Sequence, residues 1–131
     1  MSNTGTEVLY LKGTLGNTTN PTTTAVTFSL LVYPFENTVT GTVKIHKNDD
    51  VYTGQVTGKT YTTTHNHIVR LLNLKGNIPY TDKLTKTEFS FDASICFSMD
   101  WNGSGGFSFQ QEHEEKMPVT SSIFRLESIN N

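Results

Sequence analysis

Apolar and polar residues alternate along this chain with a period of two over much of its length. The longest alternating run lies between Phe89 and Trp101, where every odd-numbered residue is apolar and every even-numbered residue is polar or small. Side chains point alternately to the two faces of a β-strand, so this run predicts a strand with one buried and one solvated face. Half-buried strands are typical of antiparallel sheets. The pattern therefore predicts an all-β protein.

Further strand patterns follow at hairpin spacing, and no segment has a convincing helical pattern. We expect strands over residues 7–15, 25–33, 38–46, 51–62, 67–74, 89–101, 106–113 and 119–129. The intervening residues 18–24, 75–85 and 114–118 are predicted to be loops. About eight antiparallel strands form either an up-and-down barrel or a barrel-like β-sandwich, and the pattern leaves both open. We expect residues 1–131 to form a single all-β domain.

A glycine-rich hairpin turn is predicted after the long strand. Trp101 and Met99 belong to the apolar face of that strand, and Phe107 and Phe109 should face the same core. Because cross-strand partners share a face, the turn must contain an odd number of residues. A three-residue turn that ends at Gly105, with this glycine in the left-handed conformation, meets the requirement. It would place Trp101 opposite Phe107 and Met99 opposite Phe109.

Composition agrees with β structure and narrows the range of partners. Charged residues make up 17% of the chain, the formal net charge is −2, and Thr, Ser and Asn together form about a third of the sequence. Threonine suits a half-buried pleated surface. The small negative charge argues against binding to nucleic acid or to an anionic membrane surface. No apolar run approaches the roughly 18 residues that a membrane-spanning helix needs.

The single cysteine and residues 1–10 indicate in which cellular compartment the protein is expected. Cys96 cannot form an internal disulfide, which excludes a disulfide-stapled secreted scaffold, and its parity places it with Ser98 on the solvated face. Residues 1–10 contain neither the basic nor the apolar region of a secretory signal. The expected location is therefore the cytoplasm, with export by a signal-free route left open.

Several motifs in a particular order resemble a known family. They are the threonine-flanked strand 27–32, the Val-x-Gly strand 39–43, the dipeptide Asp100-Trp101 and the aromatic-Ser-aromatic return 107–109. In this order they resemble a small bacterial family known only as a domain of unknown function, numbered eighteen-forty-two. The resemblance spans most of the chain and implies an all-β fold. It implies no activity, so no functional residue is carried over from it.

Two histidines are the first candidates for a metal site. His65 and His67 would project from one face of a strand, as two metal ligands require. Further ligands could come from His46, His113, Glu112, Glu114 or Glu115. The carboxylate that a cupin-like site would supply shortly after the second histidine is missing from residues 68–71. Histidines at the end of a threonine-rich turn are more often exposed turn residues, and we expect neither a metal nor another cofactor.

No catalytic set is recognisable, and we expect the protein not to be an enzyme. Cys96 has no basic residue near it in sequence that would lower its pKa. No G-x-S-x-G nucleophile elbow occurs. Asp92 and Asp100 would lie about 26 Å apart at strand rise, too far to act as an acid/base pair. The glycine-rich segment 102–106 is not followed by a helix that could hold a phosphate.

Threonine-rich faces are the best candidates for a binding surface. The even-numbered side chains of strand 38–46 should lie beside the odd-numbered ones of strand 51–62. The residues concerned are Thr38, Thr40, Thr42, Thr53, Gln55 and Thr57. Their hydroxyl and amide groups would form a nearly uncharged surface, without the repulsion that keeps sheets apart. An ordinary solvated sheet would show the same composition.

These observations lead to two hypotheses. The first is a non-catalytic interaction or assembly module that docks on itself or on another protein. The second is a lectin-like carbohydrate-binding protein, for which Tyr52, Tyr61 and Trp101 could add a stacking platform. Parity places Trp101 in the core, so its part in such a platform would require an exposed end of the long strand.

Overall fold

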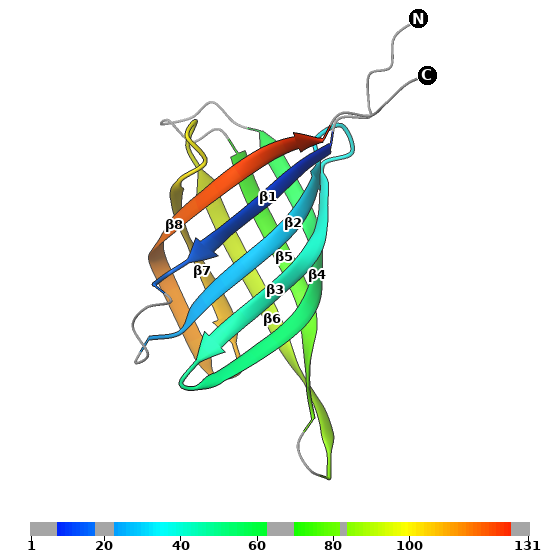
Figure 1. The fold of residues 1–131 in the computed structure, drawn as a ribbon, viewed down its shortest axis with the longest axis vertical. Coiled ribbons are helices and arrows are strands. Elements are labelled where there is room, and N and C mark those ends of the chain that lie inside the picture. The colour runs from blue at the N-terminus through cyan, green and yellow to red at the C-terminus, as the bar shows by residue number, and fades with distance from the viewer. Residues whose placement is uncertain (1–7, 18–22, 63–69, 82–83, 127–131) are drawn as a thin grey trace, which may run out of the picture.

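The chain folds into a closed antiparallel β-barrel in the computed structural model, which describes residues 8–17, 23–62, 70–81 and 84–126 (Figure 1). The strands are β1 (Val8–Leu15), β2 (Ala25–Tyr33), β3 (Thr38–Lys47), β4 (Asp50–Thr62), β5 (Arg70–Thr81), β6 (Lys86–Phe97), β7 (Gly103–Phe109) and β8 (Glu112–Leu126). Each strand pairs with the next in sequence, and β1 pairs with β8 to close the sheet. This is the up-and-down barrel rather than the sandwich. None of the described ranges contains a helix that could cross a membrane.

Side chains from all eight strands fill the interior of the barrel. The largest fully buried ones are Phe91, Phe97, Phe107, Phe109, Leu11, Leu15, Leu30, Ile45, Leu72, Leu74, Ile78 and Ile95. An eight-stranded barrel is just wide enough for its own side chains. The barrel therefore encloses a hydrophobic core, and the outward side chains of its strands are those left to meet a partner.

The end of β6 differs from the prediction. β6 stops at Phe97, which pairs with Gly103, so the turn spans the five residues 98–102 rather than three. Trp101 has a φ of 64° and takes the left-handed position of the turn that we assigned to Gly105, which instead lies in strand β7. The turn still contains an odd number of residues, as the shared core face requires. The predicted turn position was wrong because parity fixes only whether the number is odd.

The position of the turn determines which residues of β6 and β7 lie opposite each other. Phe107 lies opposite Ala93, and Phe109 lies opposite Phe91. Both phenylalanines are buried, which confirms their predicted face. The predicted pairing of Phe109 with Met99 was wrong, because Met99 lies in the turn and is 82% exposed. The turn is centred on residue 100 instead of residue 104, which changed every pair without changing which face of each strand meets the core.

A carboxylate organises the turn between β6 and β7. Asp100 Oδ1 accepts hydrogen bonds from Ser98 Oγ at 2.7 Å and from the backbone N–H of Asn102 at 3.0 Å. The prediction that Ser98 lies on the solvated face of a strand was wrong, because β6 ends at Phe97 and Ser98 belongs to the turn. The hydrogen bond from the Ser98 hydroxyl, followed by that from the Asn102 backbone, lowers the pKa of the Asp100 carboxyl below its usual value.

This turn should lose its order in acid. Because the pKa of Asp100 is lower in the folded chain than in the unfolded one, its carboxylate stabilises the fold above the unfolded pKa. That contribution disappears as the pH falls through the folded pKa. An NMR pH titration should give a midpoint for Asp100 below the usual aspartate value, and Ser98→Ala should move it upward. A midpoint at or above the usual value in the unmodified protein would contradict this role.

β5 is longer than its sequence predicts. It continues through residues 75–81, which Gly76 and Pro79 led us to interpret as a loop. This segment pairs with residues 86–92 of β6, and the two form a hairpin that reaches beyond the rest of the barrel (Figure 1). Pairing satisfies the backbone hydrogen-bonding groups of both segments, so it outweighs the turn preference of single residues.

The predicted charged loop 114–118 is also part of a strand. β8 begins at Glu112 and passes through these residues with a register irregularity opposite Gly105 and Phe107 of β7. Lys116 has a φ of 57° at this point, so the segment is an irregular, bulged part of β8. The loop prediction was wrong because a bulge accommodates turn-forming residues without ending the strand.

Candidate functional site

The outward side chains of the barrel form rows, because paired residues of neighbouring strands lie side by side. One row, followed from pair to pair around the wall, consists of Phe124, Tyr10, Leu31, Thr40, Thr57, Lys75, Asp92, Ser108 and His113. It begins with apolar residues on β8, β1 and β2, continues with threonines on β3 and β4, and ends with charged and polar residues on β5 to β8. The outer wall is thus divided into regions of different chemistry.

The predicted threonine-rich surface exists on β3 and β4. Thr40 lies opposite Thr57, and Thr42 lies opposite Gln55. The other two predicted members face lysines: Thr38 lies opposite Lys59, and Thr53 lies opposite Lys44. The structure therefore brings the six predicted side chains together on the outer wall, although the two lysines make the surface less neutral than expected.

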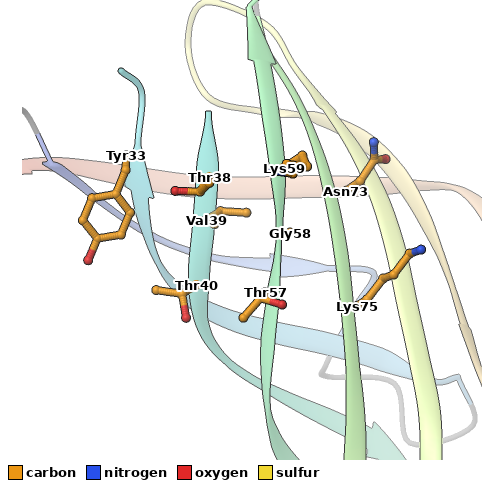
Figure 2. A pocket seen from close by; sticks show the side chains of 9 residues that line it. All are labelled: Tyr33, Thr38, Val39, Thr40, Thr57, Gly58, Lys59, Asn73 and Lys75. Carbon is orange, nitrogen blue, oxygen red and sulfur yellow. The ribbon is translucent and has the colours of Figure 1, made fainter. Parts of the chain in front are cut away.

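A shallow hollow of about 520 Å³ lies over this part of the wall (Figure 2). Its lining residues are Tyr33, Thr38, Val39, Thr40, Thr57, Gly58, Lys59, Asn73 and Lys75. Three of them, Thr38, Thr40 and Thr57, were predicted binding residues. Sequence reasoning missed Tyr33, and it missed the contributions of β5, because the lateral order of the strands was unknown. Alternation with the apolar Val32 would have placed Tyr33 on the outer face.

The three aromatic candidates do not form one platform. Tyr52 points into the barrel end, where its ring centroid lies 5.2 Å from that of Phe109 and 5.4 Å from that of Tyr80. Tyr61 is 47% exposed near the other end of the same strand, about 30 Å away at strand rise. Trp101 is half-buried in the β6–β7 turn. Tyr52 was wrongly placed on the surface because glycines obscured the alternation of β4.

Trp101 closes one end of the barrel rather than offering an open face. Its ring centroid lies 5.5 Å from that of Phe97, and Arg70 Cζ lies 5.9 Å from the centroid of the indole. Arg70 also donates a hydrogen bond to the buried Thr60 hydroxyl at 3.0 Å. The parity prediction that Trp101 packs against the core is confirmed, although the residue itself lies beyond the end of the strand.

An apolar strip on the outer wall is the second candidate surface. It consists of Val8, Tyr10, Leu31, Tyr33, Phe124 and Leu126, from the three adjacent strands β8, β1 and β2. The rings of Tyr10 and Phe124 have centroids 6.1 Å apart. Phe124 is 54% and Leu126 is 45% exposed. We refer to these six residues as the apolar strip. Sequence reasoning missed it because its two halves come from opposite ends of the chain.

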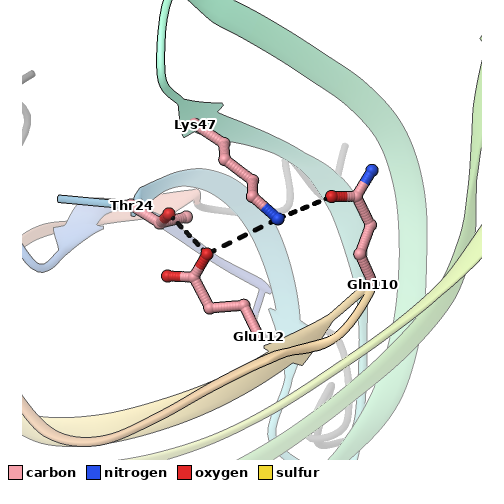
Figure 3. Close-up of polar contacts among 4 residues, drawn as sticks. All are labelled: Thr24, Lys47, Gln110 and Glu112. Atoms are coloured by element: carbon pink, nitrogen blue, oxygen red, sulfur yellow. Dashed lines mark hydrogen bonds and ion pairs between the residues drawn. The ribbon is translucent and has the colours of Figure 1, made fainter. Parts of the chain in front are cut away.

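A polar network joins strands at the end of the barrel away from the β6–β7 turn (Figure 3). Thr24 Oγ1 donates to Glu112 Oε1 at 2.8 Å, and Lys47 Nζ lies 3.6 Å from the same oxygen. Lys47 also donates to Gln110 Oε1 at 2.7 Å. A hydrogen bond with Glu112 raises the pKa of the nearby Glu114 carboxyl. Because these groups satisfy one another, the network explains how the strand ends are held together and indicates no reaction.

One serine–histidine contact lies on the open wall. Ser108 Oγ is 2.6 Å from His113 Nδ1, and His113 Nε2 is 3.3 Å from Glu115 Oε1. The order of groups resembles a nucleophile, a base and an orienting acid. However, the His113 and Glu115 side chains are 62% and 72% exposed, and catalytic electrostatics require a site from which water is excluded. We therefore interpret these contacts as a surface network.

The metal hypothesis gains no support from the described residues. His65 and His67, with the start of the predicted strand 67–74, lie outside them. Across the described ranges, no group of three His, Cys, Asp or Glu side chains could hold a metal ion.

Comparison with known proteins identifies the family. A family model described as a domain of unknown function, DUF1842, matches residues 8–114, which include seven strands and the beginning of β8. The resemblance inferred from the sequence motifs is thus confirmed. No curated protein and no solved structure matches the chain.

Proposed function

The chain belongs to the DUF1842 family, and we propose that it is a non-catalytic interaction barrel that associates with a second copy of itself through the apolar strip. The observation that carries this proposal is the position of the six strip residues. They face outward from three adjacent strands, while the core is already filled by other side chains. Contiguous exposed apolar surface on a folded protein commonly marks an interaction site.

A second copy is the occupant that this surface favours. None of the six strip residues is charged. In a two-fold contact one uncharged strip would therefore lie on another, and no charged strip residue would be desolvated. A stable interface needs about 800 Å² from each partner. The adjoining Thr38, Thr40 and Thr42 of β3 extend the uncharged surface in the direction of β4 and could supply the polar rim of such a contact.

Replacing Phe124 by serine should weaken this association by at least about tenfold. The substitution removes an exposed ring from the strip without creating a cavity in the core. Sedimentation velocity or light scattering at tens of micromolar should show a dimer for the unmodified protein and a monomer for the variant. Leu84→Ser is the matched control, because Leu84 is 96% exposed and lies next to the distant tip of the β5–β6 hairpin. A strictly monomeric unmodified protein would refute the proposal.

A second candidate function is carbohydrate binding on the threonine-rich wall. It is supported by the hollow, which combines hydroxyl groups of Thr40 and Thr57 with the amide of Asn73 and the ring of Tyr33. Shallow sites that join an aromatic ring to a few polar groups suit small polar ligands. The two candidate surfaces share Tyr33, so each is tested at residues that belong to only one of them: Phe124 for the apolar strip, and Lys59 and Lys75 for the hollow.

A further inference from the structure

We propose that the hollow over β2, β3, β4 and β5 binds a saccharide that carries an acidic group. This inference rests on the second candidate function above and specifies the class of its ligand. Figure 2 shows the arrangement: Tyr33 stands at one side, Lys75 and Asn73 stand at the other, and Thr40 and Thr57 lie between them. The floor is formed by β3 and β4 at Val39 and Gly58, where no outward side chain fills the space.

The charge of the hollow favours an anion. Its lining contains Lys59 and Lys75 and no aspartate or glutamate. Within the described residues, neither lysine takes part in an ion pair. Lys59 pairs with Asn73, and Lys75 is two residues further along the same strand, so the lysines are diagonal neighbours. Diagonal positions in a sheet are about 7–8 Å apart, which allows both ammonium groups to reach one carboxylate or sulfate.

One carboxylate lies beside this hollow without lining it. Asp92 is the partner of Lys75 on β6, but it lines a separate hollow with His113 and Glu115. A ligand anion between Lys59 and Lys75 would therefore approach from the side of β4, away from this carboxylate.

The remaining lining groups suit a sugar better than a bare anion. The Thr40 and Thr57 side chains are exposed, and the Thr57 hydroxyl can donate and accept hydrogen bonds. The Thr40 hydroxyl donates to the backbone oxygen of Val56 at 3.5 Å and can still accept a hydrogen bond from a ligand. Asn73 Oδ1 already accepts a bond from Ser94 Oγ at 2.9 Å, so its NH₂ group remains as a donor at the edge of the hollow. The half-buried ring of Tyr33 offers an apolar surface to the C–H face of a pyranose. A polyanion such as nucleic acid is disfavoured by the net charge of −2.

NMR titration of the ¹⁵N-labelled chain tests this proposal and can detect weak binding. The probes are methyl glucuronide, methyl glucoside and sodium sulfate, each at constant ionic strength. We expect methyl glucuronide to cause saturable shifts of the backbone amides of Val39 and Gly58. Methyl glucoside and sulfate should each bind at least about tenfold more weakly, because each lacks part of the recognised chemistry.

Two double variants separate the site from the overall charge. Lys59→Ala/Lys75→Ala should weaken glucuronide binding by about tenfold, since each exposed charge contributes modestly. Lys44→Ala/Lys86→Ala removes the same net charge from exposed positions outside the hollow and should leave the affinity unchanged. Equal losses in the two variants would overturn the proposal.

The three probes also distinguish the acidic class of the ligand from carbohydrate binding as such. Glucoside binding as tight as glucuronide binding would overturn the acidic class while leaving carbohydrate binding in place. Sulfate binding as tight as glucuronide binding would overturn the saccharide class. The absence of saturable shifts with both sugars would overturn carbohydrate binding as well. Because Tyr33 belongs to both surfaces, the titrations are repeated on the Phe124→Ser variant, in which self-association cannot cover the hollow.

Discussion

Replacing Phe97 by alanine is expected to destabilise the barrel by about 3–5 kcal/mol. Phe97 is the last residue of β6 and has no solvent exposure. Its ring packs against Trp101, with centroids 5.5 Å apart, so truncation would leave a cavity at the end of the core where the indole is supported. Urea denaturation should show the loss as a lower midpoint with an unchanged slope. Trp101 fluorescence is a suitable probe, because the indole should become more accessible to iodide in the variant.

A matched control lies on the same strand. Ser90 of β6 is exposed on the outer wall, opposite Asn77, and Ser90→Ala should change the free energy of unfolding by less than about 0.5 kcal/mol. If Ser90→Ala proved more damaging than Phe97→Ala, the assignment of odd-numbered β6 residues to the core would be wrong. The assignment of Phe107 and Phe109, which rests on pairing with β6, would then also be wrong.

Replacing Gly58 by alanine is expected to destabilise the protein by at least about 2 kcal/mol. A Cβ atom at Gly58 would overlap the backbone carbonyl oxygen of Asn73 on β5. The obstacle is backbone in a paired strand, so it can move only if the β4–β5 ladder is disturbed. The missing side chain at this position thus permits the close approach of the two strands that carry Lys59 and Lys75. Thermal and urea unfolding should both report the loss.

Gly54→Ala provides the comparison on the same strand. There a Cβ atom would come within 2.6 Å of Ile78 Cδ1, the end of a side chain, and within 3.2 Å of the Ile78 Cα, whereas no carbonyl oxygen is overlapped. We expect a cost of about 1 kcal/mol, clearly smaller than that of Gly58→Ala. Equal costs would mean that the β4–β5 ladder yields as easily as a side chain, contrary to the close pairing at Asn73.

Local patterns in the sequence predicted the faces of most strands. Residues 25–33 were predicted as a strand and form β2 with the same bounds. The alternation of β6 identified Phe91, Ile95 and Phe97 as buried. The neighbours Thr40 and Thr57 were also expected, because a short turn forces strands 38–46 and 51–62 to pair. The buried face of a strand depends on residues a few positions apart, so the period-two alternation of the sequence predicts it directly.

Turn length and strand ends needed more than the local pattern. Parity required an odd number of residues in the turn between β6 and β7, and both three-residue and five-residue turns satisfy this condition. The choice depends on hydrogen bonds made in the folded turn, such as those of Asp100. Likewise, residues 75–81 extend β5 because β6 lies beside them, even though their composition favours a loop.

The sequence by itself determined the all-β class, the buried face of each clear strand and the pairing of strands joined by short turns, because each depends on residues close together in the chain. Only the tertiary structure decided that the sheet closes, since β1 and β8 come from opposite ends of the described chain. That closing pair brings Tyr10 beside Phe124 and creates the apolar strip. The order of β2 to β5 in the closed wall likewise brings Tyr33 and Lys75 to opposite sides of one hollow. Surfaces assembled from distant segments have no period in the sequence, and they arise only from the lateral order and register that backbone pairing imposes on the whole barrel.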